Sequence, residues 1–300
     1  QITTYLEKAM ESEMSANVID LCPVGALTSK PYVFEARAWE LKKTESIDVM
    51  DAVGSSIRID TYGWEVKRIL PRINEEINEE WISDKTRYSC DGLKNQRLDA
   101  PFVKDGNKFT KVSRKRAHEI LKSQVEKINY EKIGCLTGDL TNMETAFAAK
   151  ELFNKVFKSN LIDSRSKNYY VNFSEKQNYI FNSNITGIEN SDLILMVGCN
   201  PRYEATLLNS RIRKSYLKSK LTIYSTNDIG DQTYPYKILD NSTNLIRDIV
   251  EGKNEISKKI IQSTKPIIMI GQSVLNLKSG QYIFEELKKF LNKNNKINNE

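Results

Sequence analysis

Hydrophobic and polar residues alternate with a period of two between residues 45 and 71, which is the spacing of half-buried β-strands. The alternating stretches cover residues 46–50, 56–62 and 64–70. Gly54 and Gly63 lie between these stretches and are typical of turns. The pattern predicts a small antiparallel β unit, and the Asp-Gly pair at residues 105–106 predicts a further hairpin.

From residue 113 the pattern changes to short apolar strands separated by amphipathic helices. We expect strands at 132–136, 192–198, 220–225 and 266–270, and helices at 113–127, 141–157, 205–217, 242–263 and 281–291. Ser113 would cap the first helix, and a capping box at Thr141-Asn-Met-Glu144 would open the second. This alternation predicts a parallel sheet covered on both faces, a doubly wound α/β domain that ends without an obvious closing strand.

The first residues are less regular. Residues 3–14 have apolar positions at helical spacing, and residues 17–21 indicate a short strand or an extended approach to Cys22. A chain of 300 residues can form about two modest cores. We expect an α/β protein with boundaries after residues 30 and 112, so that residues 1–30, 31–112 and 113–300 form a short N-terminal part, a β-rich domain and an incomplete α/β domain.

Composition and charge narrow the function classes. No window approaches the roughly 18 consecutive apolar residues of a membrane helix, so no direct membrane insertion is expected. The net charge of +6 comes from 45 basic and 39 acidic residues that are interspersed, which argues against nucleic-acid binding. The chain starts with Gln1 and lacks a secretory signal, so we expect its true N-terminus upstream, in a processed, split or truncated protein.

Four single cysteines, Cys22, Cys90, Cys135 and Cys199, lack the paired spacing of a disulfide scaffold and indicate a reducing compartment. Cys22 stands in Leu21-Cys-Pro-Val-Gly-Ala-Leu-Thr28. A cysteine followed by proline and small residues is typical of the last ligand of a ferredoxin-like four-iron cluster, where backbone N–H groups face the sulfurs. The alternative is a buried free cysteine before a turn.

Longer stretches resemble one known family, the large (75 kDa type) iron-sulfur subunit of NADH:ubiquinone oxidoreductase, complex I. The resemblance covers most of residues 1–270. It is carried by Asn17-Val-Ile-Asp-Leu-Cys-Pro-Val-Gly-Ala-Leu-Thr-Ser-Lys-Pro-Tyr32, residues 36–55 and 72–88, Cys90-Asp-Gly-Leu-Lys-Asn-Gln-Arg-Leu98, and residues 146–152 and 187–205.

The resemblance implies that residues 1–30 end a four-iron cluster domain and that Cys22 is the fourth, remote ligand of a [4Fe-4S] cluster. The other three cysteines would come from a Cys-x-x-Cys-x-x-Cys run outside this chain, supplied by a missing segment or a companion chain. It also implies partners in the peripheral arm: the flavoprotein NADH-binding subunit and the quinone-proximal subunits. The expected location is the matrix side of the mitochondrial inner membrane, or the cytoplasmic face in a bacterium.

A second cluster is not expected. Some bacterial relatives have a cysteine motif in the stretch that corresponds to residues 39–46, closed by a cysteine near the position of Cys90. Here that stretch contains no thiol. Since one thiolate cannot hold four irons, Cys90 is interpreted as unligated.

The α/β domain also resembles the molybdopterin-dependent oxidoreductases, with Gly198-Cys-Asn-Pro201 at the place of a pterin-contacting loop. The arginine–cysteine–histidine element of active enzymes has no counterpart near residues 163–168, although Ser164 and Ser166 are conceivable ligands. We therefore expect a cofactor-free domain without molybdopterin.

No catalytic residue is predicted in this chain. His118 lacks a nucleophile or carboxylate arrangement and is interpreted as a surface or packing residue. The prediction is an electron-transfer subunit of complex I. The alternatives are a molybdopterin oxidoreductase fragment and a structural subunit without a cluster.

Overall fold

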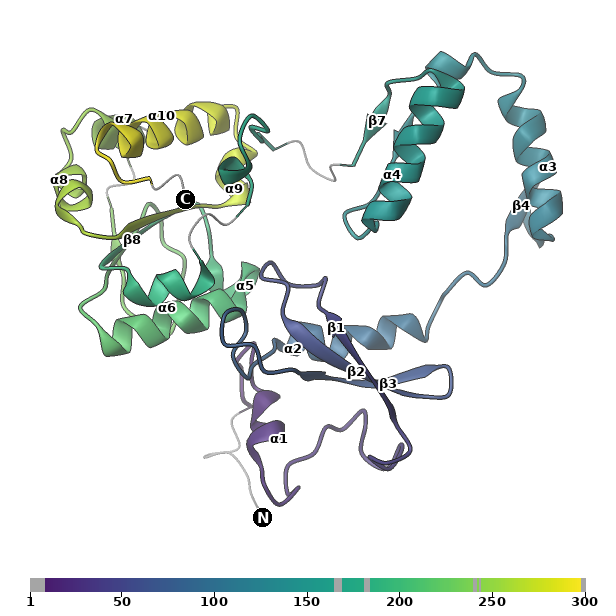
Figure 1. Cartoon of the computed structure of the whole chain (residues 1–300), viewed down its shortest axis with the longest axis horizontal. Coiled ribbons are helices and arrows are strands. Elements are labelled where there is room, and N and C mark those ends of the chain that lie inside the picture. Colours follow the sequence, from purple (N-terminus) through teal and green to yellow (C-terminus); the bar gives the residue numbers. More distant parts are fainter. Residues whose placement is uncertain (1–8, 165–168, 181–183, 240–241, 243, 298–300) are drawn as a thin grey trace. The chain divides into compact units, whose positions relative to one another are not determined.

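The computed structural model describes residues 9–164, 169–180, 184–239, 242 and 244–297 (Figure 1). The chain divides into two compact units, one formed by residues 1–91 and 169–300 and the other by residues 92–168. The three domains expected from the sequence divide the chain differently, and their boundaries stay a prediction.

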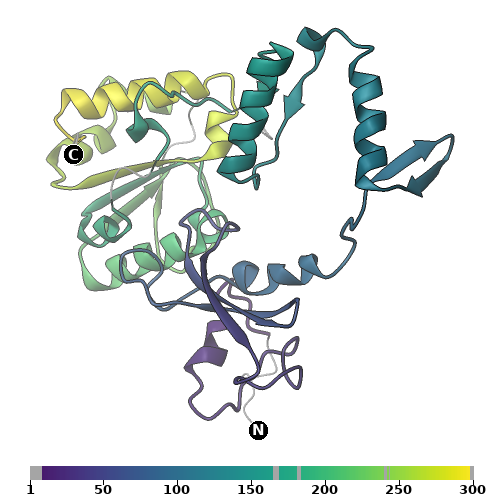
Figure 2. The same ribbon diagram turned by 45° about the vertical axis from the view of Figure 1, so that its right-hand side comes forward.

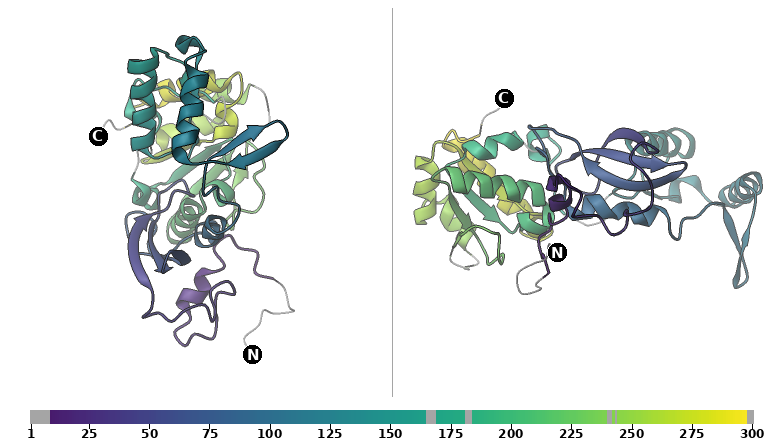
Figure 3. Two further views of the ribbon diagram at one scale, coloured as in Figure 1. Left: turned by 90° about the vertical axis from the view of Figure 1, so that its right-hand side faces the viewer. Right: turned by 90° about the horizontal axis from the view of Figure 1, so that it is seen from below.

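The first unit contains a three-stranded antiparallel sheet. Its strands β1 (Lys42–Ile47), β2 (Ser56–Tyr62) and β3 (Glu65–Pro71) pair in the order β1-β2-β3, and Figure 3 shows them as one small twisted sheet. Ile57 of β2 and Ile69 of β3 pack with Ile82 and Cys90 in a small hydrophobic core. The antiparallel unit predicted from period-two alternation is confirmed, but its first strand lies at residues 42–47 and not over the predicted 46–50.

The same unit contains a parallel sheet of four strands. Its order is β10 (Lys237–Ile238), β9 (Thr222–Ser225), β8 (Leu193–Val197) and β11 (Pro266–Ile270), with every neighbouring pair parallel. Strand β8 lies inside the sheet, and all five of its residues are buried, as the continuous apolar run predicts.

Helices cover both faces of this sheet (Figure 1). On one face, Ile194 and Met196 of β8 pack with Leu208 and Ile212 of α6 (Thr206–Lys218). On the other face, Leu193, Leu195 and Val197 pack against three helices, which are α7 (Leu245–Val250), α8 (Glu255–Gln262) and α10 (Gly280–Lys293). Two short helices, α5 (Pro201–Glu204) and α9 (Gln272–Leu275), follow β8 and β11. The doubly wound α/β prediction is confirmed.

Arg211 of α6 joins the α/β part of this unit to the β-rich part. Its guanidinium is 3% exposed and donates to the backbone carbonyl oxygens of Glu75 at 2.5 Å and Ile77 at 3.1 Å. It also forms an ion pair with Glu189 at 2.7 Å. These hydrogen bonds and this ion pair give the buried guanidinium partners in both parts, so Arg211 holds the two parts together.

Residues 17–21 form a helix, α1 (Asn17–Leu21), so the predicted strand is wrong. The carboxylate of Asp84, far away in the sequence, accepts the N–H of Ala16 at 2.9 Å at the start of this helix. Tertiary contacts therefore decide the local structure here.

Of the helix predicted at 3–14, residues 9–14 are not helical, and residues 3–8 lie outside the described residues. Ser83 caps helix α2 (Asp84–Tyr88), because its side-chain oxygen accepts the N–H of Thr86.

The second unit contains the predicted hairpin, β4 (Phe102–Asp105) and β5 (Lys108–Lys111), which extends from the start of α3 (Arg114–Val125) in Figure 2. Ser113 caps α3 as predicted. Helix α4 (Met143–Glu151) continues as a π-helical turn over Leu152–Phe157. Two short strands, β6 (Cys135–Leu136) and β7 (Ile162–Asp163), pair in parallel.

The predicted capping box before α4 is wrong. The N-cap is Asn142, whose side chain accepts the N–H of Thr145 at 2.9 Å. Glu144 thereby falls one position too early to reach back to the cap, since a capping box needs its acid at the third helical position.

Four short segments of the described residues are 3₁₀ helices: Ser89–Leu93, Tyr130–Lys132, Lys176–Asn178 and Ile185–Asn190.

Candidate functional site

Cys22 lies at the end of α1, where the chain leaves the helix. Its backbone is extended (φ −77°, ψ 106°), and its N–H donates to the carbonyl oxygen of Ile19 at 3.3 Å. The chain then turns through Gly25, whose φ of +66° is readily adopted by glycine. The Cys22 residue is partly exposed, while its neighbours Leu21 and Val24 are 59% and 81% exposed.

The backbone of the loop after Cys22 lowers the pKa of its thiol. Hydrogen bonds from the backbone of Leu27, Val24, Ala26 and Gly25 lower the pKa of its thiol below the ordinary value of 9.0, against a small opposing effect of burial. The partial positive charges of these groups favour the thiolate over the thiol. The loop is therefore built to stabilise negative charge on the sulfur, as a metal-bound thiolate requires.

The helix that precedes Cys22 is held by Asn17. The side chain of Asn17, 4% exposed, donates to the carbonyl oxygens of Met14 at 2.9 Å and Ile82 at 2.8 Å, and its oxygen accepts the N–H of Ile82 at 3.2 Å. The Asn17 side chain thus both donates to and accepts from the backbone of Ile82. It ties α1 to the segment before α2.

Asp84 holds the turn before α1. Its carboxylate accepts the hydroxyl of Ser15 at 2.6 Å and the N–H of Ala16 at 2.9 Å. In return, the N–H of Asp84 donates to the carbonyl oxygen of Glu13 at 2.8 Å. Hydrogen bonds to a carboxylate are stronger than those between neutral groups, so the start of α1 is firmly placed.

Arg87 holds the end of α1 close to Cys22. Its guanidinium, 5% exposed, forms an ion pair with Asp20 at 2.5 Å and also donates to the side chain of Asn17 at 3.3 Å. The thiol of Cys90 donates to the carbonyl oxygen of Arg87 at 3.7 Å. The last residues before Cys22 are thus anchored on both sides.

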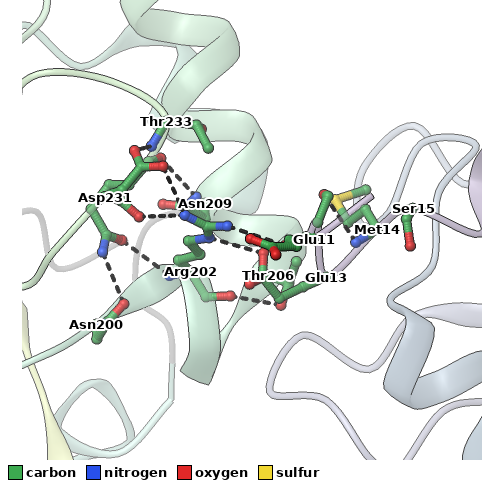
Figure 4. Close-up of polar contacts among 12 residues, drawn as sticks. Glu11, Glu13, Met14, Ser15, Asn200, Arg202, Thr206, Asn209, Asp231 and Thr233 are labelled. Carbon is green, nitrogen blue, oxygen red and sulfur yellow. Dashed lines mark hydrogen bonds and ion pairs between the residues drawn. The ribbon is translucent and has the colours of Figure 1, made fainter. Parts of the chain in front are cut away.

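Arg202 connects this N-terminal segment to the carboxyl end of β8 (Figure 4). Its Nε donates to Glu13 at 2.9 Å, and its terminal nitrogens reach the carboxylate of Asp231 at 3.0 Å and the carbonyl oxygen of Glu11 at 3.4 Å. The Glu13 hydrogen bond raises the pKa of Arg202 further. The segment that leads to Cys22 is therefore attached both to α2, through Asp84, and to α5, through Arg202.

The other three cysteines lie in different elements. Cys90 and Cys199 are buried, whereas Cys135, on β6, is partly exposed like Cys22. Burial raises the pKa of the Cys199 thiol to about 12, and the thiol donates to the carbonyl oxygen of Met269 at 3.6 Å. Within the described residues, no group of three or more His, Cys, Asp or Glu side chains could hold a metal ion. A complete cluster at Cys22 would need thiolates from elsewhere.

The loop at residues 198–201 follows β8, at the carboxyl end of the parallel sheet. It closely approaches the loop after β11: a Cβ added to Gly271 would lie 2.0 Å from the carbonyl oxygen of Gly198. Ser273 also donates to that oxygen. The two loops thus touch backbone to backbone at the edge where open α/β sheets bind ligands.

The remaining candidates are exposed or lie outside the described residues. His118 is exposed on α3. Ser164 is exposed, and its N–H donates to the side chain of Asp163 at 2.8 Å, while Ser166 lies outside the described residues. Sequence reasoning missed Asn17, Asp84, Arg87 and Arg202. No local pattern could have found them, because each has a partner that lies 65 to 191 residues away.

Comparison with known families identifies the class of protein. The family model described as molybdopterin oxidoreductase matches residues 97–300, and the chain belongs to that family. Two further models match the N-terminal part: the NADH-ubiquinone oxidoreductase NDSU1/NuoG-like 4Fe-4S domain over residues 41–91 and the NADH-quinone oxidoreductase subunit 3 ferredoxin-like domain over residues 1–28. These two matches indicate an iron-sulfur cofactor.

Individual relatives narrow the family further. The 78 kDa mitochondrial subunit of NADH-ubiquinone oxidoreductase from Neurospora crassa is 46% identical over 98% of this chain and 40% of its own length. The 75 kDa subunit from Reclinomonas americana is 46% identical over 96% of this chain and 44% of its own length. A subunit of the NADH-quinone oxidoreductase from Rickettsia prowazekii is 41% identical over 98% of this chain and 44% of its own length. The resemblance to the large iron-sulfur subunit of complex I is confirmed, and the chain spans less than half the length of these relatives.

Among solved structures, acetylene hydratase from Pelobacter acetylenicus aligns with a TM-score of 0.48 at 12% identity, covering 85% of this chain and 36% of that one. A likeness of this degree carries no conclusion about function.

Across the described residues, the helices are too short or too polar to span a bilayer.

Proposed function

We propose that the chain is an electron-transfer subunit of the peripheral arm of complex I, in which Cys22 is one ligand of a [4Fe-4S] cluster. The other three thiolates come from cysteines outside this chain, on a further segment of the same protein or on a companion polypeptide. When bound, the cluster takes up and releases single electrons between NADH and ubiquinone. The chain itself has no catalytic residue.

The observation that carries this proposal is the position of Cys22, which is partly exposed at the end of helix α1, before a turn at Gly25, in residues 1–28 that match the ferredoxin-like domain. A cysteine before a glycine-containing turn is typical of a cluster ligand, and the lowered pKa of its thiol agrees with that role. The polar anchors on α1 support the same role, because Asn17, Asp84 and Arg87 hold the ligand-bearing loop in one position. Electron transfer over a fixed distance needs a ligand that does not move.

Partners and location follow from the relatives. The partners are other complex I subunits, including the flavoprotein NADH-binding subunit and the quinone-proximal subunits, and the location is the matrix side of the mitochondrial inner membrane or the bacterial cytoplasmic face. No molybdopterin is expected at the edge of the parallel sheet. The close contact of Gly198 with Gly271 and the occupied hydrogen bonds of Arg202 support that expectation.

The test is Cys22→Ser in the intact complex. We expect one four-iron signal to disappear or change shape in the electron paramagnetic resonance spectrum of the reduced enzyme. We also expect NADH–quinone electron transfer to fall, since a hard oxygen ligand replaces a soft thiolate.

Cys135→Ser is the matched control, because Cys135 is also partly exposed but lies on β6. It should leave all signals unchanged. Normal cluster content and normal electron transfer in the Cys22 variant would refute the proposal and leave a structural subunit. Stoichiometric molybdenum in the purified complex would favour the molybdopterin alternative.

A further inference from the structure

Arg202 lies at the carboxyl edge of the parallel sheet in the first unit. It is the second residue of α5, the short helix that follows β8, and the loop after the neighbouring strand β9 contains Asp231 and Gln232. Open α/β sheets bind their ligands at this edge. The guanidinium of Arg202 is therefore placed as it would be for an anionic ligand.

The groups that occupy this guanidinium belong to the chain itself (Figure 4). Its Nε donates to the carboxylate of Glu13 at 2.9 Å, and one terminal nitrogen donates to the backbone carbonyl oxygen of Asp231 at 2.8 Å and to its carboxylate at 3.0 Å. The other terminal nitrogen reaches the carbonyl oxygen of Glu11 at 3.4 Å. Since the side chain is only 15% exposed, Arg202 binds the N-terminal segment much as it would bind a free carboxylate.

Buried amide side chains hold the backbone of Arg202. Its N–H donates to the side chain of Gln232 at 3.2 Å, and the buried Gln232 donates to Asn200 at 3.0 Å and to the carbonyl oxygen of Ile229 at 2.7 Å. Asn209 of α6 donates to the carbonyl oxygen of Gln232 at 3.1 Å. The loops of the sheet thus fix Arg202, and the N-terminal segment is bound by a firmly placed partner.

A short series of hydrogen bonds leads from Glu13 to Cys22. The carbonyl oxygen of Glu13 accepts the N–H of Asp84 at 2.8 Å, and the Asp84 carboxylate accepts the N–H of Ala16 at 2.9 Å, where α1 begins. Helix α1 has five residues, and Cys22 is its C-cap, whose N–H donates to Ile19. A displacement of Glu13 is therefore transmitted to Cys22, because hydrogen bonds fix each step between them.

We propose that Arg202 is a positioning residue for Cys22, so that the carboxyl edge of the parallel sheet fixes the orientation of the cluster ligand through Glu11 and Glu13. The inference rests on the proposed function of Cys22 as a ligand. Groups that hold a metal ligand without touching the metal set the orientation of the ligand and thereby tune the metal. The α/β domain then contributes to electron transfer through this contact, without a cofactor of its own.

The planar fork of arginine explains why this residue type stands here. Its nitrogens bind Glu11, Glu13 and Asp231 in three directions. An ammonium group is a single point charge on a flexible stem, so lysine would keep the charge but not this geometry. Arg202→Lys is therefore expected to preserve only part of the effect on Cys22.

The first test is Arg202→Gln in the intact complex, with Arg213→Gln as the matched control. Arg213, on α6, is exposed and donates to the same loop after β9, at the carbonyl oxygen of Thr233 at 3.2 Å. We expect Arg202→Gln to change the line shape and the midpoint potential of the four-iron signal that depends on Cys22, with Arg202→Lys in between. Arg213→Gln should leave both as they are. An unaltered signal in Arg202→Gln, or the same change in Arg213→Gln, would overturn the proposal.

The second test approaches the same contact from Glu13, whose side chain is 26% exposed and lies outside the sheet. Glu13→Ala should change the signal in the same way as Arg202→Gln. The double variant should show no greater change than either single variant, because both remove one contact. Changes that add, or an unaltered signal in Glu13→Ala, contradict the positioning role.

Amide hydrogen exchange of residues 14–22 gives a readout that needs no cluster. Exchange should be about tenfold faster in Arg202→Gln than in Arg213→Gln, since a hydrogen bond to a charged group contributes at least that factor to local stability. Mass spectrometry of the intact complex measures it. Equal exchange in the two variants overturns the proposal.

These measurements separate the inference from the proposed function. A Cys22-dependent signal that is the same in the Arg202 and Glu13 variants disproves the positioning role and leaves the function intact. A complex whose four-iron signals do not depend on Cys22 disproves the function, and faster exchange of residues 14–22 in Arg202→Gln would then still show that Arg202 places residue 22.

Discussion

Cys22 and Cys199 show how one residue type acquires opposite properties in two regions of the same unit. Cys22 lies in a partly exposed loop after a short helix, and backbone N–H groups lower the pKa of its thiol. Cys199 follows the buried strand β8, and burial raises the pKa of its thiol to about 12. Both cysteines stand at the end of a regular element, so position in an element does not decide reactivity.

The difference comes from what surrounds each sulfur. Around Cys22 backbone N–H groups act on the thiol, and the helix before it is fixed by charged and amide side chains. Around Cys199 the surroundings are apolar, since it belongs to the core of Ile194, Met196 and Ile212. The α/β region therefore buries the Cys199 thiol in a packed core, whereas the loop after α1 leaves the Cys22 thiol partly exposed.

The largest expected difference between the regions is thiol reactivity. With iron removed, iodoacetamide should label Cys22 at least about a thousandfold faster than Cys199, because a pKa near 12 is three units above the ordinary 9.0 and each unit is tenfold in thiolate. Labelling of Cys22 should also persist to lower pH than labelling of an ordinary cysteine. Mass spectrometry of timed samples measures both rates. Equal labelling of the folded protein contradicts the comparison, while equal labelling in denaturant is expected.

The next effect concerns the loops that close the edge of the parallel sheet. Gly271→Ala should lower the free energy of unfolding by about 3 kcal/mol, because its Cβ would lie 2.0 Å from a backbone oxygen that cannot easily move. Gly92→Ala is the control, since a Cβ there meets nothing within 4 Å. Chemical denaturation measures both. If the two variants were equally stable, the loops would not be in contact.

A smaller effect is expected at the anchor of α1. Asn17→Ala removes hydrogen bonds to Met14 and Ile82 and leaves the buried N–H of Ile82 unpaired, which should cost about 2 kcal/mol. Asn292→Ala, an exposed position on α10, should change stability by less than about 0.5 kcal/mol. Thermal unfolding followed by circular dichroism measures both, and a cost at Asn17 as small as at Asn292 would mean that α1 needs no such anchor.

The smallest effect depends on pH. Burial alone would raise the pKa of the Asp192 carboxyl, but hydrogen bonds from Ser263, Thr264 and Lys265 outweigh burial and hold this pKa below the ordinary 3.8. Since the folded-state pKa is lowered, the carboxylate stabilises the fold above pH 3.8, and this contribution is lost as pH falls.

Asp192→Asn should therefore cost about 1 kcal/mol at pH 7, because the site is exposed and its hydrogen bonds compete with water. The gap between the variant and the unaltered protein should close as pH falls through the lowered pKa. Urea unfolding at pH 7 and pH 3 measures it. A gap that stayed constant with pH would show that the charge of Asp192 is not involved.

Short-range patterns in the chain were enough to predict several elements of the fold. Period-two alternation predicted the strands β2 and β3, and apolar runs between amphipathic helices predicted the parallel sheet around β8. The turn at Cys22 was also predicted, because proline and glycine restrict or free the backbone locally. Resemblance to a known family, which the comparisons confirm, supplied the expected role of Cys22 as a ligand.

Contacts between distant residues, in contrast, determine how Cys22 is held and which cysteine stays accessible. Residues 17–21 became a helix through Asp84 and Ile82, and Arg202 reached Glu13 across 189 residues. Such contacts leave no local pattern, since they pair residues that the chain brings together only after folding. The sequence alone also could not predict the pKa values of the two thiols, because burial and the direction of backbone dipoles are properties of the folded chain.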